Sequence, residues 1–463
     1  MLYGNEVLRD FYLGNTNEED LRRREKQARN AAQEYARANT VEEHQAATLI
    51  RDGAYPYSKF QELGLYAPQG FFEKTIDFSP TSMPLMPQTL SPFFGKCISE
   101  LAMMLYLSDP NRTANVTFMG IGAGKGFLDH DLIDHLMTVK MNPEWEDEVN
   151  RLRRTSEFLV TDRTDRSQTL LEEELTEARQ AHQLGDRLKI MRVNATGFEL
   201  ERKPYGIIYG NEILDNMPVE PIIEIDEALY GVVVVPYSEG MQVADEESDY
   251  KRALGERFPE LKGKTLSKDE ARRLIETGAM GLIKFKPVLI PLHSLPDLRE
   301  KVENSSATQS NLENPDYENL YPLQTGLTPM LRSVRKSFSH GTILLIDYQP
   351  VHGNTHNWNQ AVLNVLNFSL KDPHDLDFQI DFDQVKEEAS REKMEVSYFS
   401  PQNETLITFS SLLNTLTLKD MQRWAKANGY GNLTPAQLPA AIKSSYALFL
   451  PFSNFHNIIC LSF

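Results

Sequence analysis

The segment Met119–Gly126, MGIGAGKG, contains four glycines and one lysine, and it follows the apolar run Val116–Met119. The stretch directly after it, FLDHDLIDHLMTV, has the pattern of a helix. An apolar strand, a glycine turn and a helix in this order are typical of α/β folds with a parallel sheet. Glycines let the backbone turn tightly and let a ligand approach the main chain. This one segment therefore restricts the fold more than any other part of the chain.

The spacing of the glycines distinguishes between three known glycine-rich motifs. A Walker A loop requires GxxxxGK followed by Ser or Thr, but Gly120 is one residue too close to Gly124–Lys125 and Gly126 follows the lysine. The dinucleotide motif GxGxxG fails because its last position is Lys125 or Phe127. The motif that fits is GxGxG, and the helix after it offers free N–H groups to an anion. We expect that anion to be the carboxylate of S-adenosylmethionine (SAM), held by Gly122, Ala123, Gly124 and Gly126; a plain tight turn is the alternative.

Polar residues follow the next two predicted strands. Asp162 ends the second strand, where a carboxylate can accept hydrogen bonds from both ribose hydroxyls. Asn194 and Ala195 end the third strand, where a polar side chain and a backbone N–H could face an adenine edge. The sequence therefore predicts a cofactor site at the carboxyl ends of three strands.

Composition excludes several classes of protein. The formal charge of -18 opposes unaided binding to nucleic acid or to an anionic membrane, and no apolar run is long enough for a membrane helix. Two cysteines in 463 residues exclude a disulfide framework and favour a reducing compartment. The N-terminus lacks the features of signal and transit peptides, so we expect a cytoplasmic protein.

Short β-branched runs alternate with helical stretches and predict five strands of a parallel sheet, at residues 116–121, 157–161, 188–193, 206–209 and 342–347. A gap of more than a hundred residues before the last strand indicates an inserted subdomain. We expect a helix-rich N-terminal cap over 1–110, core segments over 111–220 and 336–463, and an insert over 221–335. Within this scheme we predict one or two helices over 17–52, an exposed loop over 303–326 and a C-terminal antiparallel hairpin.

The fourth strand carries the most specific pattern, GIIYGNEILDNMPVEPI. It resembles the strand-four signature of the MidA/NDUFAF-type family of SAM-dependent methyltransferases. The matching residues are Asn211, Glu212, Asp215, Pro218 and Val219. Similar blocks occur in the family's order elsewhere in the chain, at LYAPQGFF, SPFFG, GTILLIDY, DFQIDFDQV and SPQNETL.

This resemblance implies a class I SAM-methyltransferase fold, which is a Rossmann-like, doubly wound, seven-stranded sheet. It places Ser91 beside the cofactor and implies transfer to an arginine side chain of a partner protein. Mitochondrial members of the family methylate a respiratory complex I subunit, so a mitochondrial matrix location is the alternative compartment. Three places depart from the family: Gly120 replaces an acid before the glycines, Met86–Thr89 replaces the block Thr-Ser-Pro-Glu, and Gln379 replaces a histidine.

Candidate catalytic residues follow strand four. A guanidinium acceptor needs its charge held and a proton removed, which suits paired carboxylates. Glu212 and Asp215 are three residues apart and share one side if a helical turn begins there. We predict that Glu212 clasps the acceptor, that Asp215 assists or orders the loop, and that Asn211 orients the attacking nitrogen. The alternative for Asp215 is a helix cap.

The sequence is compatible with other acceptors and with a function other than catalysis. A small-molecule acceptor and a SAM-binding assembly factor without turnover are the alternatives to a protein acceptor, and the 17–52 helix could serve a homodimer. We predict no metal site, because His130 and His135 do not have the spacing of a helical ligand pair.

Overall fold

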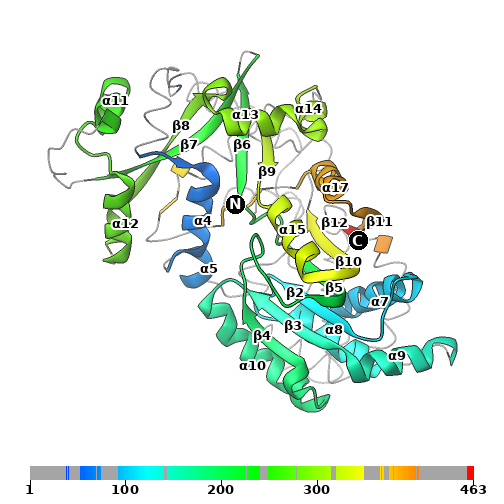
Figure 1. Cartoon of the computed structure of the whole chain (residues 1–463). Coiled ribbons are helices and arrows are strands. Elements are labelled where there is room, and N and C mark those ends of the chain that lie inside the picture. Colours follow the sequence, from blue (N-terminus) through cyan, green and yellow to red (C-terminus); the bar gives the residue numbers. More distant parts are fainter. Residues whose placement is uncertain are drawn as a thin grey trace, which may run out of the picture. The chain divides into compact units, whose positions relative to one another are not determined.

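The computed structural model describes residues 38, 40, 53–68, 70–74, 92–139, 143–225, 227–239, 249–277, 279–313, 320–348, 365–366, 368–369, 375–378, 380–402, 404–405 and 456–463. The chain forms two compact units (Figure 1). Unit 1 falls within residues 1–74, 218–325 and 350–384, and unit 2 within 75–217, 326–349 and 385–463. Nearly all of the helix predicted over 17–52 lies outside the described residues, as do Ser91 and Gln379.

Unit 2 is built on a seven-stranded sheet with the order β11-β12-β10-β5-β2-β3-β4. Its strands are β2 (Val116–Ile121), β3 (Glu157–Asp162), β4 (Leu188–Arg192), β5 (Lys203–Asn211), β10 (Phe338–Tyr348), β11 (Glu395–Pro401) and β12 (His456–Ser462). The strands from β4 to β10 pair in parallel, and β12 is antiparallel to both of its neighbours. This topology confirms the doubly wound seven-stranded sheet.

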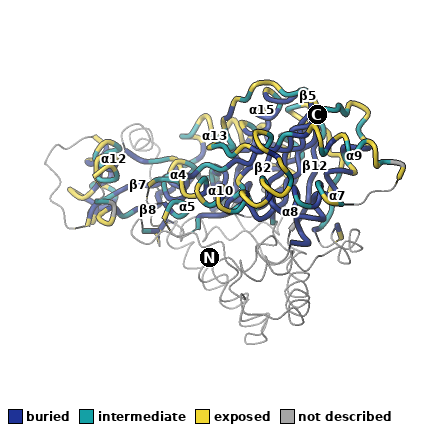
Figure 2. The backbone as a smooth tube through the Cα atoms, turned by 90° about the horizontal axis from the view of Figure 1, so that it is seen from below, coloured by how far each residue is buried: buried dark blue, intermediate teal, exposed yellow. Residues whose placement is uncertain are grey.

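The helices of unit 2 cover the sheet because its central strands are apolar on both faces. All six residues of β2 are buried, and β2 and β12 run through the dark blue core in Figure 2. The described helices are α7 (Phe93–Ser108), α8 (Phe127–Thr138), α9 (Pro143–Thr155), α10 (Asp165–Ala181) and α15 (Leu327–Ser337), followed by α17 (Phe382–Arg391) at the unit boundary. Because parallel strands end at one edge, the loops after β2, β3, β4 and β5 open on the same side of the sheet.

The predicted C-terminal hairpin is wrong. Both edges of β12 are already paired, with Leu345 of β10 opposite Ile459 and Phe399 of β11 opposite the same residue. The apolar run before β12 lies outside the described residues, and no edge of β12 remains for it. A local turn signal could not reveal that the last strand inserts between two strands distant in sequence.

Unit 1 contains a five-stranded sheet made of β1 (Tyr55–Pro56), β6 (Val219–Ile225), β7 (Ala228–Ser238), β8 (Ile283–Pro291) and β9 (Leu320–Gln324). The long strand β7 pairs antiparallel with β1, β6 and β8. Its helices are α4 (Tyr57–Tyr66), α5 (Phe71–Lys74), α11 (Asp249–Arg257), α12 (Lys268–Glu276), α13 (Pro296–Glu303) and α14 (Ser306–Glu313). Residues 53–74 and 218–325 thus belong to one unit, whereas α7 belongs to unit 2.

The segment 303–326 is not the exposed loop that its polar composition predicts. It contains α14 and β9, and β9 pairs antiparallel with β6. Tyr321 and Leu323 are buried in a cluster with Ile222 of β6. The sequence did not predict β9, because the strand has only five residues, turn-forming residues flank it, and its partner β6 is distant in sequence.

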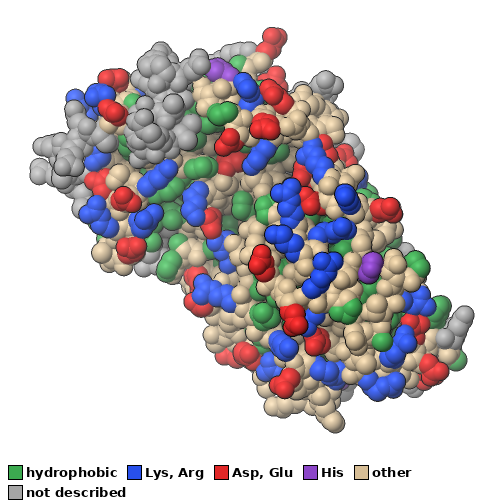
Figure 3. Space-filling model, in the orientation of Figure 1, with side chains coloured by type: hydrophobic (Ala, Val, Ile, Leu, Met, Phe, Trp, Pro, Cys, Tyr) green, Lys and Arg blue, Asp and Glu red, His purple; other side chains and the backbone are tan. Residues whose placement is uncertain are grey.

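Charges are mixed on the surface. Lys and Arg side chains alternate with Asp and Glu over the face shown in Figure 3. Among the residues that the structure describes, no helix is both long and apolar enough to cross a membrane.

Glu220 caps the first turn of α4 inside unit 1. Its carboxylate accepts a hydrogen bond from the Tyr57 N–H at 3.2 Å and another from the Ser58 hydroxyl. Burial raises the pKa of Glu220 to about 7, and the hydrogen bonds from Ser58 and Tyr57 oppose this shift only in part. An isosteric glutamine could keep both hydrogen bonds, because its oxygen accepts from Tyr57 and its NH₂ donates to the hydroxyl.

We therefore predict that Glu220→Gln reduces the pH dependence of stability. The pKa is higher in the folded chain than its ordinary value of 4.5, so the stabilisation is present below pH 4.5 and is lost as pH rises through 7. Wild type should lose about 2 kcal/mol of unfolding free energy from this group between pH 5 and pH 8, and the variant should not. Denaturant unfolding at both pH values measures this difference; equal pH slopes would contradict it.

Candidate cofactor and active site

The glycine loop after β2 has a conformation that requires its glycines. Gly122, Gly124 and Gly126 have φ values of 65°, 58° and 85°, in the left-handed region. The Ala123 N–H donates to the Thr161 carbonyl at 3.0 Å, and the Gly126 N–H donates to the Ala123 carbonyl at 2.8 Å. Gly126 is the N-cap of α8, so the loop leads directly into a helix N-terminus that can receive an anion.

The turn after β5 packs against this loop. A Cβ atom on Gly122 would lie 2.5 Å from Cγ2 of Ile213, and a Cβ atom on Gly210 would lie 2.7 Å from Cδ1 of the same side chain. Both glycines are therefore needed for close approach. The contact joins the glycine loop to the Asn211–Asp215 segment, two motifs that are far apart in sequence.

Asp162 lies beside the loop, as the sequence predicts. Its Oδ2 accepts from the Gly124 N–H at 2.9 Å, and its Oδ1 accepts from the Thr164 N–H at 3.2 Å. Burial raises the pKa of Asp162, and these two amides oppose the shift. Each carboxylate oxygen can accept a second hydrogen bond, so the ribose contact remains a prediction that the geometry allows.

Asn194 and Ala195 follow β4 in a turn. The Asn194 side-chain oxygen accepts from the Thr196 N–H at 3.2 Å and from the Thr196 hydroxyl at 3.0 Å. The amide thus holds its own turn, and this turn presents Ala195 at the same edge of the sheet as Asp162. Their proposed role at an adenine edge stays a prediction.

The segment after β5 is a turn and not a helix. Glu212 has a φ of 51°, which is uncommon for a residue other than glycine, and its N–H donates to the Ile346 carbonyl at 2.8 Å. The Met217 N–H closes the turn on the Leu214 carbonyl at 3.1 Å, and β6 begins two residues later. Pro218 cannot continue a helix. The helical turn that would place Glu212 and Asp215 on one side is therefore absent, and Asp215 caps no helix.

Asp347 holds this turn and was missed as a site residue. Its buried Oδ2 accepts from the Leu214 N–H at 2.9 Å and from the Asp215 N–H at 3.3 Å. The signals in the sequence were an acid at the end of the fifth strand and the block GTILLIDY, which contains this acid. Asp215 is itself buried and accepts from the Asn216 amide at 3.0 Å. Asn211 is buried at the end of β5, whereas Glu212 is partly exposed.

The histidines of α8 form pairs with carboxylates of neighbouring helices. His130 Nδ1 lies 2.9 Å from Glu174 of α10, and His135 Nε2 lies 2.8 Å from Glu100 of α7. Within the described ranges no group of three or more His, Cys, Asp and Glu side chains is arranged to hold a metal ion. The two pairs join α8 to the helices on either side of it.

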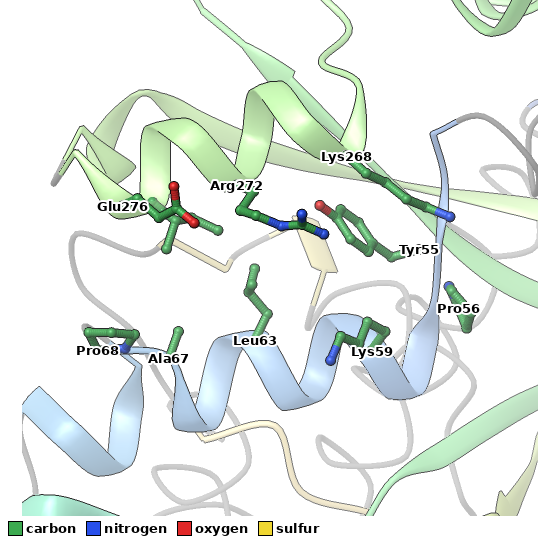
Figure 4. A pocket seen from close by; sticks show the side chains of 10 residues that line it. Tyr55, Pro56, Lys59, Leu63, Ala67, Pro68, Lys268, Arg272 and Glu276 are labelled. Carbon is green, nitrogen blue, oxygen red and sulfur yellow. The ribbon is translucent and has the colours of Figure 1, made fainter.

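Unit 1 has a cavity of about 720 Å³ between α4 and α12 (Figure 4). Leu63 of α4 points toward Arg272 of α12 across it, and Lys59 of α4 and Lys268 of α12 also line it. The remaining lining residues are Tyr55, Pro56, Ala67, Pro68, Ile275 and Glu276. The cavity therefore combines apolar walls with cationic side chains.

The strand order, the left-handed glycine loop and the acid at the end of β3 together define a class I SAM-binding fold. Comparisons with known proteins support this fold. Residues 97–400 match the model of a family described as "Putative S-adenosyl-L-methionine-dependent methyltransferase". The chain belongs to this family, which confirms the resemblance seen in the sequence, and it is a SAM-dependent methyltransferase. A search of curated proteins finds no match.

Two solved structures from Burkholderia thailandensis share the fold. One was solved with S-adenosyl-homocysteine bound and has a TM-score of 0.55, with 16% identity over 89% of this chain and 88% of that chain. The other, a native structure from the same superfamily, has a TM-score of 0.51, also with 16% identity over 89% and 88% of the two chains. At this identity the two structures support the fold.

The residues around the loop fit SAM as the cofactor. The glycine cradle would be filled by a Cβ atom at Gly122, and the N-terminus of α8 suits the carboxylate of the amino-acid end. When bound, SAM supplies a methyl group already activated by the sulfonium. The protein therefore has to hold and orient the reactants, and Asp162 and the loop amides are the groups that would hold the cofactor.

We predict that Gly122→Ala destabilises the chain by about 3 kcal/mol and weakens SAM binding. The new methyl group meets Ile213 in addition to straining a left-handed backbone. Gly185→Ala is the matched control, because Gly185 also has positive φ but has no atom within 4 Å of the added Cβ, so it should cost only about 1 kcal/mol. Denaturant unfolding and SAM titration measure both effects; equal losses in the two variants would contradict the packing role of Gly122.

Proposed function

We propose that this methyltransferase transfers the methyl group of SAM to an arginine side chain of a partner protein. The observation that carries the proposal is the Asn211–Asp215 turn, which holds two carboxylates and an amide and packs through Ile213 on Gly122 of the glycine loop. A guanidinium is cationic and planar, and carboxylates are its preferred partners. The resemblance to the MidA/NDUFAF-type family supports the same acceptor.

The two carboxylates have different surroundings and therefore different proposed roles. Asp215 is buried and hydrogen-bonded to Asn216, and its own N–H is held by Asp347. Such a group orders the turn. Glu212 is partly exposed and has a left-handed backbone conformation, which the hydrogen bond from its N–H to the Ile346 carbonyl holds. We assign the acceptor clasp to Glu212.

The reaction itself asks for positioning and for removal of one proton. Methyl transfer requires the nucleophile, the methyl carbon and the sulfur in line. In our proposal Glu212 holds the guanidinium and accepts the proton that the attacked nitrogen loses, while the Asn211 oxygen orients that nitrogen. The positive charge leaves the sulfonium as the C–S bond breaks, so no external oxidant or reductant is needed.

A small-molecule acceptor is the second candidate, and the cavity of unit 1 favours it. A space of about 720 Å³ with apolar walls and three cationic side chains would suit an anionic organic molecule better than an arginine side chain. The two proposals thus differ in the charge of the acceptor.

The acceptor class can be tested by incubating the pure protein with methyl-labelled SAM and a host lysate. We expect label in a protein band that yields methylarginine after acid hydrolysis. Label confined to small molecules would replace our proposal with the second candidate, and no transfer at all would contradict both.

We predict that Glu212→Gln lowers kcat roughly 10²–10³-fold, because the neutral amide can neither hold the guanidinium charge nor accept the proton. Affinity for SAM should change by less than about twofold, since Glu212 acts on the acceptor. Glu173→Gln, at an exposed position of α10, is the control and should behave like wild type. Steady-state methyl transfer and SAM titration measure both quantities, and unchanged turnover would remove Glu212 from the mechanism.

A further inference from the structure

Asp129 lies in the first turn of α8. Its carboxylate occupies the position that a side chain at residue 120 of β2 would fill. A Cβ atom built on Gly120 would lie 2.0 Å from Oδ1 of Asp129 and 3.1 Å from its Cγ. The carboxylate can lie there only because residue 120 has no side chain. It therefore stands at the end of β2, directly behind the glycine loop, although it comes from the helix.

The surroundings of this carboxylate are anionic or neutral. Tyr209 of β5 donates its hydroxyl to Asp129 Oδ1 at 2.8 Å, and Asp162 of β3 adds a second negative charge nearby. Only 1% of Asp129 is exposed. In the described part of the chain, no Lys, Arg or His forms an ion pair with it. Burial, reinforced by Asp162, raises the pKa of Asp129 to about 7, while the Tyr209 hydrogen bond lowers it.

A buried carboxylate without a cation is costly to keep charged, and a cationic ligand beside it would offset that cost. SAM, the cofactor that we place at this loop, carries such a cation. The amino-acid end of SAM has an α-ammonium beside the carboxylate that the N-terminus of α8 is placed to receive. The N-terminus of α8 also favours the ionised form of Asp129 through its dipole.

We propose that Asp129, reaching across Gly120, is the counter-charge for the α-ammonium of SAM, and that cofactor binding displaces a proton from this carboxyl to solvent. The inference rests on SAM as the cofactor and on its placement at the glycine loop. Gly120 and Asp129 act as a pair: the glycine provides the space, and the helix provides the acid. Tyr209 is the positioning residue that fixes the carboxylate from β5.

The test uses S-adenosyl-homocysteine, which keeps the α-ammonium, and 5′-methylthioadenosine, which lacks the whole amino-acid end. For wild type, affinity for S-adenosyl-homocysteine should rise about tenfold between pH 6 and pH 8, because the ammonium pairs with the ionised acid. Calorimetry at pH 7 in two buffers of different ionisation enthalpy should show release of a fraction of a proton. Affinity for methylthioadenosine should depend on pH much less.

Asp129→Asn should bind S-adenosyl-homocysteine at least tenfold more weakly at pH 8 and should release no proton, with methylthioadenosine affinity unchanged. Gly120→Ala should behave in the same way, because its methyl group expels the carboxylate. Gly197→Ala is the control, since an added Cβ there has no atom within 4 Å. Thermal unfolding of each variant separates a binding defect from a folding defect.

Tyr209→Phe keeps the inference testable if the Asp129 variant fails to fold. Loss of its hydroxyl removes the hydrogen bond that lowers the pKa of Asp129, so the midpoint of the pH profile should move to higher pH. A purely structural role of Tyr209 would leave that midpoint unchanged. If S-adenosyl-homocysteine binds with no pH dependence and no proton release, the inference is overturned while the methyltransferase assignment stands. If it binds to none of the proteins at any pH, the inference and the proposed function both fall.

Discussion

The hydrogen bond from the Gly124 N–H to Asp162 is the interaction on which the site depends. It ties the glycine loop after β2 to the end of β3 at 2.9 Å, and it holds Gly124 in a left-handed conformation that other residues rarely adopt. A second hydrogen bond, from the Ala123 N–H to the Thr161 carbonyl, ties the same loop to β3 one residue earlier. The position of the α8 N-terminus and the orientation of the Asp162 carboxylate both follow from these contacts.

The parallel pairing of the strands brings the other loops of the site together. Because β2 lies between β3 and β5, the loops that follow these strands meet at one edge. Ile213 then packs on Gly122, so the turn that carries Glu212 is joined to the cofactor loop by direct contact. Asp347, at the end of β10, fixes that turn from the other side through two backbone amides. The strand order thus brings together the residues that we propose to bind the cofactor and the acceptor.

Much of this could be predicted from the sequence, because local patterns report local structure. The glycine spacing, Asp162 and the strands were read from periodicity and turn residues, and the family followed from the strand-four signature. What the sequence could not show depends on contacts between distant segments. Three features can be seen only in the folded sheet. They are the insertion of β12, the pairing of β9 with β6, and the placement of the Asp129 carboxylate beside Gly120. The spacing of Glu212 and Asp215 would suit a helical turn, but the chain forms a tight turn there, and Pro218 and the strand β6 follow it directly.

Calorimetric titration of the wild type and Asp162→Ala with S-adenosyl-homocysteine, NAD and ATP tests the central claim most directly. The account predicts one S-adenosyl-homocysteine per wild-type chain, no comparable binding of NAD or ATP, and an affinity at least tenfold lower for Asp162→Ala. Asp165→Ala, an exposed acid three residues further on, should retain wild-type affinity. Unchanged affinity in Asp162→Ala, or tighter binding of NAD, would contradict the assignment of the glycine loop as the SAM site.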